Sequence, residues 1–368
     1  MENTLEANSF GCTNCGADLK FKPGTTHLNC DYCGTKNEIP QIDEPIQEFD
    51  YNNFLSQESS TANKLVENFV KCNSCGASSS LPENVSSALC PYCATPLVIE
   101  EAQQENLIQP KSLLPFKLDK NQAKTNFKQW INKLWFAPGD LKKSALNFDH
   151  FKGVYIPYWT YDTDTKTAYS GQRGEYYYVN ESYTTTENGK TVTKTRQVRK
   201  TRWYNVSGHV QHFFDDILTV ATKSLNKKYI NKLEPWDLDN LVAFDKSYLS
   251  GFITEKYQIN LSEGFEIAKD IADVKIRTLV KRDIGGDDQR IILLNTNYEN
   301  IKFKHLLLPV FVCAYNYKNK LYQFLVNGRT GEIQGKRPYS WIKIVAFAFI
   351  ILAIRTVWIE FKKKVIQK

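Results

Sequence analysis

Eight of the nine cysteines in this 368-residue chain fall into two sets that share one spacing, C-x2-C-x14-C-x2-C. The sets are Cys12, Cys15, Cys30 and Cys33, followed by Cys72, Cys75, Cys90 and Cys93. Each C-x2-C pair predicts a tight knuckle that points two thiolates at one place, and four thiolates about 2.3 Å from one ion form a closed tetrahedral zinc site. A closed site leaves no position for water or substrate, so the spacing predicts two structural zinc ions.

The two sets belong to an internal repeat with an offset of 60 residues, in which Gly16 aligns with Gly76 and Tyr32 with Tyr92. Disulfides and rubredoxin-type iron are the rival interpretations, and two complete sets at one spacing favour zinc. Thiolate ligands need reduced cysteine, so the ribbons are expected in a cytosol-like compartment. The ninth cysteine, Cys313, lies in an apolar run and is predicted to be a small buried hydrophobe.

Charge is divided unevenly along the chain. Residues 1–110 hold five lysines and 15 acidic residues, a net charge of −10, while the whole chain has +7 and the remainder therefore +17. A basic stripe is the usual electrostatic signature of a nucleic-acid-binding module. The acidic cysteine-bearing part lacks one, which argues against DNA binding through the ribbons.

A basic run later in the chain is the second candidate for chemistry. Its members are Lys190, Lys194, Arg196, Arg199, Lys200 and Arg202, with tyrosines and Trp203 on either side. This composition predicts contact with single-stranded nucleic acid through phosphates and stacking, or with anionic lipid headgroups. The competing interpretation is a solvated hairpin with charges on its outer face, since Asn188-Gly189 between β-forming residues is a strong hairpin signal.

Catalytic signatures are missing from the sequence. Gly189-Lys190-Thr191 imitates the end of a P-loop, but that motif requires glycine where Thr184 stands. His209 and His212 are three residues apart, so on a strand they would face opposite sides and not share a metal. No nucleophile elbow or H-E-x-x-H motif occurs, and we expect no enzyme.

The remaining pattern predicts the elements that position these residues. The expected organisation is a zinc ribbon at 10–40, an acidic linker at 41–70, a second ribbon at 71–100, an α+β domain at 111–338 and a transmembrane helix at 341–359. Within the linker, Leu65, Val66, Phe69 and Val70 suggest a short helical face, and residues 100–110 are expected to be a polar linker.

In the α+β domain, helices are predicted after a capping box at Asp119 and Gln122, and again over residues 263–279. Between and after them, period-two segments predict a mainly antiparallel sheet. Pro157 lies within the first of these segments, which suggests an edge strand or a bulge there.

An apolar segment near the C-terminus, Trp341 to Ile359, predicts one membrane-spanning helix about 28 Å long. Lys343 and Arg355 would snorkel to the two interfaces, and Trp341 and Trp358 would lie in the aromatic belts. An interfacial helix and a buried soluble helix are the alternatives. The positive-inside rule taken alone mildly favours a cytosolic tail, whereas the thiolates favour a cytoplasmic location for the bulk of the chain. A single span cannot satisfy both, and we expect the thiolates to decide the orientation.

Around the second cysteine set, the sequence resembles the zinc-ribbon superfamily of the transcription factor IIB type. Taken whole, it resembles a bacterial family of zinc-ribbon membrane proteins that often carry a label linking them to primosomal protein N′, the replication-restart helicase. The stretches concerned are Leu114-Pro115-Phe116, Trp135-Phe136-Ala137-Pro138, Ile156-Pro157-Tyr158-Trp159, Ser207-Gly208-His209 and Glu234-Pro235-Trp236-Asp237-Leu238. The resemblance implies zinc binding. A helicase motor is not implied, because the chain contains no Walker A motif.

Together these observations predict a membrane-anchored zinc-binding protein that acts as a binding or scaffold module, with the bilayer and another protein as partners. The alternative is a nucleic-acid-binding protein linked to replication restart or transcription.

Overall fold

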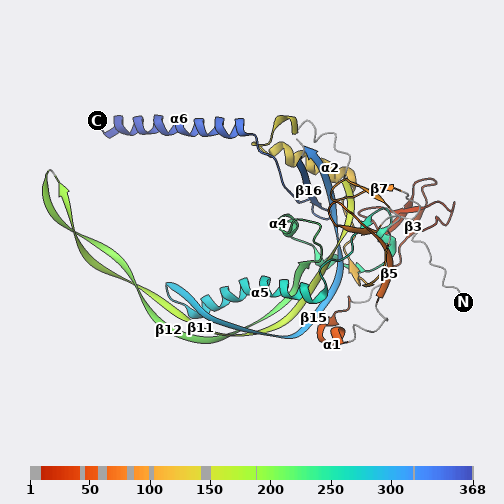
Figure 1. Ribbon diagram of the computed structural model, residues 1–368, viewed down its shortest axis with the longest axis horizontal. Coiled ribbons are helices and arrows are strands. Elements are labelled where there is room, and N and C mark those ends of the chain that lie inside the picture. Colours follow the sequence, from red (N-terminus) through yellow and green to blue (C-terminus); the bar gives the residue numbers. More distant parts are fainter. Residues whose placement is uncertain are drawn as a thin grey trace.

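Two small cysteine-bearing ribbons lie at one end of a long, curved antiparallel sheet (Figure 1). This computed structural model describes residues 10–41, 46–56, 64–80, 87–98, 103–141, 151–187, 189–317 and 320–366. Ribbon 1 is a three-stranded antiparallel sheet of β1 (Leu19–Phe21), β2 (His27–Cys30) and β3 (Lys36–Glu38).

Ribbon 2 is built from two small sheets. One joins β6 (Ser78–Ser80), β5 (Lys64–Lys71) and β9 (Gln103–Ile108), and the other is the hairpin of β7 (Ser87–Leu89) and β8 (Pro96–Val98). The expected helical face at residues 65–70 is therefore wrong, and residues 103–108 of the expected polar linker form a strand. Both segments are strands because β5 pairs with β9 from Lys64↔Ile108 to Phe69↔Gln103, a partnership that a local pattern cannot reveal.

Between the ribbons, the chain is fixed to the body of the protein. β4 (Phe49–Asp50) pairs with the body strand β15 (Asp288–Tyr317), and α1 (Tyr51–Ser56) follows it. The Phe54 ring packs edge-on against Phe303 with centroids 5.1 Å apart. Residues 49–56 of the expected linker thus pack against the body sheet.

The body is a nine-stranded sheet dominated by three long strands. β11 (Phe151–Glu187) lies between β12 (Lys190–Val220) and β15, antiparallel to both. The other strands are β10 (Ser112–Leu113), β13 (Val242–Ala243), β14 (Ile253–Thr254), β16 (Lys320–Asn327), β17 (Ile333–Gly335) and the linker strand β4. Two pairings, β10 with β15 and β11 with β14, are parallel.

Pro157 lies in the central strand of this sheet, which differs from the expected edge position. On one side β11 pairs continuously with β15, where Pro157 is opposite Leu307. On the other side β14 pairs with Val154 and Tyr155, and the last residue of β12, Val220, lies opposite Tyr158. Proline falls in the gap between these two partners, where its missing N–H removes no ladder hydrogen bond.

Two amphipathic helices cover the sheet. α2 (Lys120–Lys133) begins at the predicted capping box, with the Gln122 backbone donating to Asp119, and buries Phe127 and Ile131. α5 (Leu261–Ile284) has a second capping box, formed by Asn260 and Glu263. The short helical turns of the body are α4 (Lys227–Ile230) and the 3-10 segments Asn231–Leu233, Leu238–Asn240 and Lys246–Leu249.

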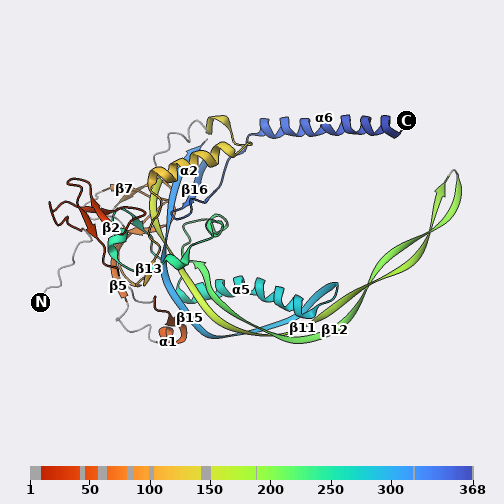
Figure 2. The ribbon, with the colours of Figure 1, turned by 180° about the vertical axis from the view of Figure 1, so that it is seen from behind.

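α5 lies along the three long strands (Figure 2). Its buried residues include Gly264, Ala268 and Ala272, and the two alanines belong to the same core cluster as Trp159 and Tyr161 of β11. These small side chains let the helix approach the sheet closely. A Cβ on Gly264 would lie 2.8 Å from a Trp159 ring carbon, and it would also meet the Tyr161 hydroxyl. The close fit fixes the helix over the base of the long strands.

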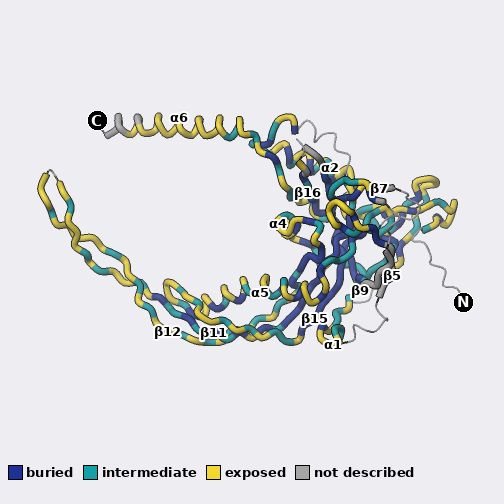
Figure 3. The backbone as a smooth tube through the Cα atoms, in the orientation of Figure 1, coloured by how far each residue is buried: buried dark blue, intermediate teal, exposed yellow. Residues whose placement is uncertain are grey.

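Beyond the end of α5, β11 and β12 continue as a two-stranded ribbon, here called the arm (residues 175–202). Pairing with β15 stops at Gly174↔Asp288, whereas pairing with β12 continues to Glu187↔Lys190. The turn contains Gly189 at φ 74°, the left-handed conformation expected of Asn-Gly. Most of the arm is exposed (Figure 3).

The last helix, α6 (Trp341–Ile366), extends away from the body on the same side as the arm (Figure 1). Its first turns rest on the segment after α2, where Phe136 and Phe347 pack ring to ring with centroids 5.5 Å apart. The Lys343 ammonium donates to the carbonyls of Trp135 and Ala137 at 3.2 and 2.8 Å. This lysine was expected to snorkel, but the body supplies its partners.

Candidate metal centres

Each cysteine set converges to a point. Across ribbon 1 the Cys12 and Cys33 sulfurs are 3.6 Å apart, and those of Cys15 and Cys30 are 3.5 Å apart. In ribbon 2 the sulfurs of Cys72 and Cys93 are 3.5 Å apart, and those of Cys75 and Cys90 are 3.6 Å apart. All ligand atoms of a set lie within 4.8 Å of one another. A tetrahedron with metal–sulfur bonds of about 2.3 Å has edges of about 3.8 Å, so both sets fit a zinc ion.

Four knuckles position these sulfurs through the same backbone turn. The fourth residue after the first cysteine of each knuckle returns its N–H to that cysteine's carbonyl, as in Gly16 to Cys12 at 2.9 Å and Gly76 to Cys72 at 2.8 Å. This residue has a left-handed φ in every case, from 60° to 77°. Three knuckles use glycine there, and the fourth uses Ala94 at φ 60°, a conformation that costs an L-residue about 1 kcal/mol.

Hydrogen bonds favour the thiolate form of the last ligand in each set. The Thr35 hydroxyl lies 3.1 Å from the Cys33 sulfur, and hydrogen bonding from this residue lowers the pKa of Cys33 to about 5. In ribbon 2, burial raises the pKa of Cys93, but hydrogen bonds from Thr95 outweigh it and lower the value to about 7. Because zinc binds thiolates, both threonines assist metal binding.

The two ribbons are seated differently, although their sequences repeat. Tyr32 of ribbon 1 is 86% exposed, whereas its equivalent Tyr92 in ribbon 2 is fully buried. The Tyr92 hydroxyl donates to Glu255 at 2.7 Å, and the Thr222 hydroxyl donates to the other oxygen of that carboxylate at 2.6 Å. Burial raises the pKa of Glu255 to about 7. The second knuckle of ribbon 2 is therefore inserted into the body.

Ribbon 1 reaches the body through its strands. Phe21 packs edge-on against Tyr248 with centroids 5.1 Å apart, and its backbone N–H donates to the Ser250 carbonyl at 3.1 Å. The Gly24 N–H donates to the Phe116 carbonyl at 2.9 Å. The buried apolar residues of each ribbon thus belong to a hydrophobic cluster that also contains residues of the 111–338 region.

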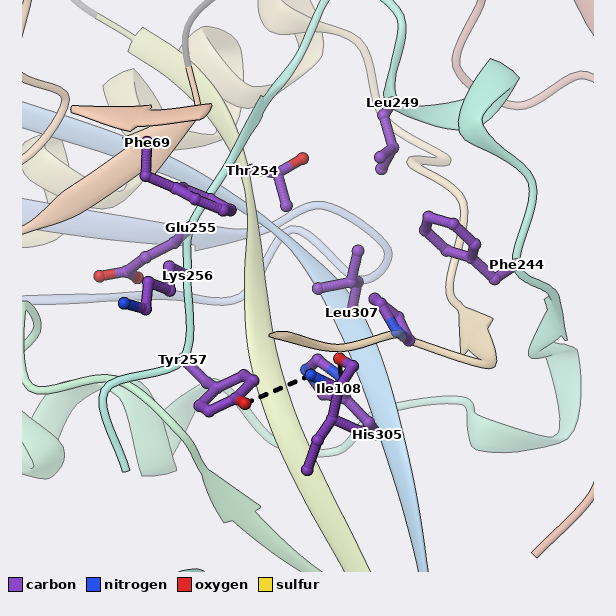
Figure 4. A pocket seen from close by; sticks show the side chains of 11 residues that line it. Phe69, Ile108, Phe244, Leu249, Thr254, Glu255, Lys256, Tyr257, His305 and Leu307 are labelled. Atoms are coloured by element: carbon purple, nitrogen blue, oxygen red, sulfur yellow. Dashed lines mark hydrogen bonds between the residues drawn. The ribbon is translucent and has the colours of Figure 1, made fainter. Parts of the chain in front are cut away.

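A small pocket lies where β5 and β9 of ribbon 2 meet the body (Figure 4). The Ile108 N–H donates to the Tyr257 hydroxyl at 3.3 Å, and the His305 Nδ1 lies 2.8 Å from the Ile108 carbonyl and so donates to it. Burial lowers the pKa of His305 to about 4, which keeps the imidazole neutral. Because the Tyr257 and His305 side chains hydrogen-bond to the β9 backbone, we interpret the pocket as a packing gap at the contact between ribbon 2 and the body.

The sequence did not single out Glu255 or His305. Glu255 is 163 positions from Tyr92, and His305 is 197 positions from Ile108. The position of a single carboxylate or histidine within a polar segment carries no signal of such partners.

Five of the six predicted nucleic-acid or lipid contacts share one face of the arm. Strand register places Lys190, Lys194, Arg196, Lys200 and Arg202 on this face, here called the charged face, with Arg199 on the other. Three carboxylates lie among the five cations. Glu181 pairs with Lys200 at 2.9 Å and with Arg196 at 4.0 Å, and Glu187 pairs with Lys194. Arg199 stacks on Tyr176, 4.1 Å from the ring centroid.

The expectation that His209 and His212 point to opposite faces agrees with the register of β12 against β11. Nearby, Asp216 lies at a bulge with φ 49° and pairs with Lys304 at 2.7 Å. Within the described ranges, the ligand-type side chains that gather closely enough to hold a metal are the two cysteine sets.

Comparison with known proteins gives one informative relative and no family. The chain is 25% identical over 340 residues to the uncharacterized protein YdjG of Bacillus subtilis (strain 168), an alignment that covers 92% of each chain. No family model matches the chain, and no solved structure matches it. These comparisons support neither the primosomal label nor a transcription factor IIB-type family. The paired four-cysteine sets are compatible with zinc ribbons.

Proposed function

We propose that this chain is a membrane-tethered scaffold that zinc stabilises, with a binding rather than a catalytic role. The observation that carries the proposal is the geometry of the two cysteine sets and the way their ribbons pack against the body. Each has four sulfurs and no open coordination position, and ribbon 2 is locked to the body through Tyr92 and Glu255. Zinc in such sites would stabilise the fold, because the free energy of metal binding is then free energy of folding.

The membrane part of the proposal rests on α6. Residues Trp341–Ile359 are long and apolar enough to cross a bilayer, and no part of that segment is buried in the protein. Lys362 stacks on Trp358, 4.3 Å from the ring centroid, as expected where a helix leaves the hydrocarbon. The sulfur ligands favour a cytoplasmic location for the rest of the chain.

The direction of the arm limits how α6 can cross. Both project from the same side of the body, so a bilayer perpendicular to α6 in this position would also meet the arm (Figure 2). A polar ribbon with unpaired edges cannot enter hydrocarbon. We therefore propose that α6 swings away about residues 336–340 when it inserts, breaking the Lys343 contacts to the Trp135 and Ala137 carbonyls.

The test combines metal analysis with membrane extraction of the full-length protein. We expect two zinc ions per chain and a membrane pellet that resists carbonate. A chain ending at Pro338 should be released to the supernatant with both zinc ions. Extraction of the full-length protein by carbonate would make α6 an interfacial helix, and well below two zinc ions in reduced protein would refute the metal assignment.

Nucleic-acid binding is the alternative function, supported by the cations of the arm and the rings they stack on. Besides Arg199 on Tyr176, Arg202 lies over Tyr177 and Arg196 over Tyr183. A crosslinked pull-down from intact cells, with and without nuclease, separates the two functions. Partners that survive nuclease support the scaffold, and partners that vanish support the alternative.

A further inference from the structure

The arm has two free strand edges. β11 loses its β15 partner after Gly174, so residues 175–187 have one open edge, and β12 is an edge strand of the nine-stranded sheet. At about 3.4 Å per residue, the 13 residues 175–187 present about 44 Å of unpaired backbone. An isolated two-stranded ribbon is marginally stable in water, and open edges are templates for another strand.

The charged face of the arm repeats every six residues. Glu175, Glu181 and Glu187 on β11 lie directly opposite Arg202, Arg196 and Lys190 on β12. Between these charged pairs, the cross-strand pairs on the same face are Tyr177 with Lys200, Val179 with Val198, Tyr183 with Lys194 and Thr185 with Val192. On this face every ionisable carboxylate belongs to β11 and every cation to β12, so the arm has an acidic edge and a basic edge.

We propose that the arm pairs edge to edge with the arm of a second copy of this chain, β11 of one copy against β12 of the next. Arms that point in the same direction bring an outgoing β11 beside an incoming β12, which is the antiparallel arrangement. Each glutamate then has a cation on both sides. A neighbour displaced by six residues keeps the same match, because the charges repeat with that period.

Charge also selects against the other pairings. Two β12 edges placed together would set cations opposite cations, and two β11 edges would set glutamates opposite glutamates, which destabilises a sheet. The preferred contact is therefore head-to-tail and extends to further copies as a ring or a row. The β11 glutamates that lie opposite these cations on the charged face would repel a phosphate backbone, so a second arm fits this surface better than a polyanion. This inference does not depend on zinc or on membrane insertion.

Cysteine crosslinking of full-length protein in detergent micelles tests the contact. Differently tagged chains carrying Val179→Cys and Val198→Cys are mixed and oxidised mildly. We expect a disulfide-linked heterodimer, and far less product from either variant alone. The unmodified chain is the blank for the native cysteines, and Val179→Cys mixed with Val274→Cys, an exposed site on α5, measures random collision.

Charge reversal supplies the second readout. Glu181→Arg places an arginine opposite Arg196, both within one arm and across the contact between two arms. Arg196→Glu likewise places a glutamate opposite Glu181. Added to the cysteine chains, either change in both partners should lower the heterodimer yield by about fivefold. Glu181→Arg in the Val179→Cys chain mixed with Arg196→Glu in the Val198→Cys chain should restore the yield. The introduced arginine on β11 of one copy then lies opposite the introduced glutamate on β12 of the other copy.

Two results of the crosslinking and binding assays would overturn the proposal. One is an equal yield from Val198→Cys alone, which would mean that basic edges meet. The other is the absence of a heterodimer together with binding to a single-stranded oligonucleotide or to phosphatidylglycerol vesicles, when Arg196→Glu abolishes that binding.

A variant with a shortened arm, in which Asn-Gly replaces residues 175–202, should retain two zinc ions and be a monomer by light scattering. Retained multimers of that variant would likewise contradict the proposal.

Discussion

Replacing Tyr92 by phenylalanine tests the seating of ribbon 2, and the internal repeat supplies its own control. The change removes only a hydroxyl, which donates to the buried Glu255 carboxylate at 2.7 Å. Leaving one oxygen of a buried carboxylate without its donor costs about 1.5–3 kcal/mol. Tyr32→Phe makes the same chemical change at the equivalent position, where the side chain is 86% exposed, and should change stability by less than about 0.5 kcal/mol.

The cost of Tyr92→Phe should grow with pH. Burial raises the pKa of Glu255 from its ordinary 4.5 to about 7. The stability that protonated Glu255 contributes is therefore fully present below about pH 4.5 and is lost as pH rises through about 7. Hydrogen bonding from Tyr92 favours the ionised form, so its removal raises the folded-state pKa further and extends the loss to higher pH.

We expect a difference between Tyr92→Phe and the parent protein of about 1 kcal/mol at pH 6, where Glu255 is mostly protonated, and of about 1.5–3 kcal/mol at pH 8. Urea unfolding of the full-length protein in detergent, followed by tryptophan fluorescence with zinc in the buffer, measures both values. Equal effects of Tyr32→Phe and Tyr92→Phe would refute the asymmetric seating. A cost that stays the same from pH 6 to pH 8 would refute the assignment of Glu255 as the titrating partner.

Three further outcomes concern the cysteine sets, the packing of α5 and the apolar segment of α6. Cys75→Ser and Cys15→Ser should each remove one of two zinc ions by elemental analysis, and Cys75→Ser should also lower the melting temperature of the body, because ribbon 2 covers Glu255. Gly264→Ala should destabilise the protein by about 1–3 kcal/mol in urea, since its Cβ meets Trp159 and Tyr161, whereas Gly139→Ala, with nothing within 4 Å, should be nearly neutral. Phe349→Arg, at the centre of the apolar segment of α6, should raise the cost of insertion by about 2.5–3.5 kcal/mol, and Ile342→Arg, near its edge, by much less, as measured by the carbonate-resistant fraction.

Sequence spacing alone identified the two four-cysteine sets, because four knuckle cysteines need only local turns and a short return of the chain to converge. The C-x2-C spacing, the capping box at Asp119 and the Asn-Gly turn before Lys190 are local signals, and the structure has a knuckle, a helix start and a hairpin at these positions. The apolar segment 341–359 was likewise readable, since its composition depends on no partner.

The tertiary structure decided everything that depends on a distant partner. β5 and β9 are strands because each pairs with the other across ribbon 2, and Pro157 lies in a central strand because two partners leave a gap there. The sequence indicated several separate strands between residues 153 and 220, whereas β11 and β12 run unbroken apart from a bulge. Tyr32 and Tyr92 show this most clearly. They are equivalent residues of the two repeats, and one is exposed and the other buried because the rest of the chain packs only against Tyr92. A local pattern encodes a turn or a helix start, but burial and edge pairing are set by contacts between segments far apart in the sequence.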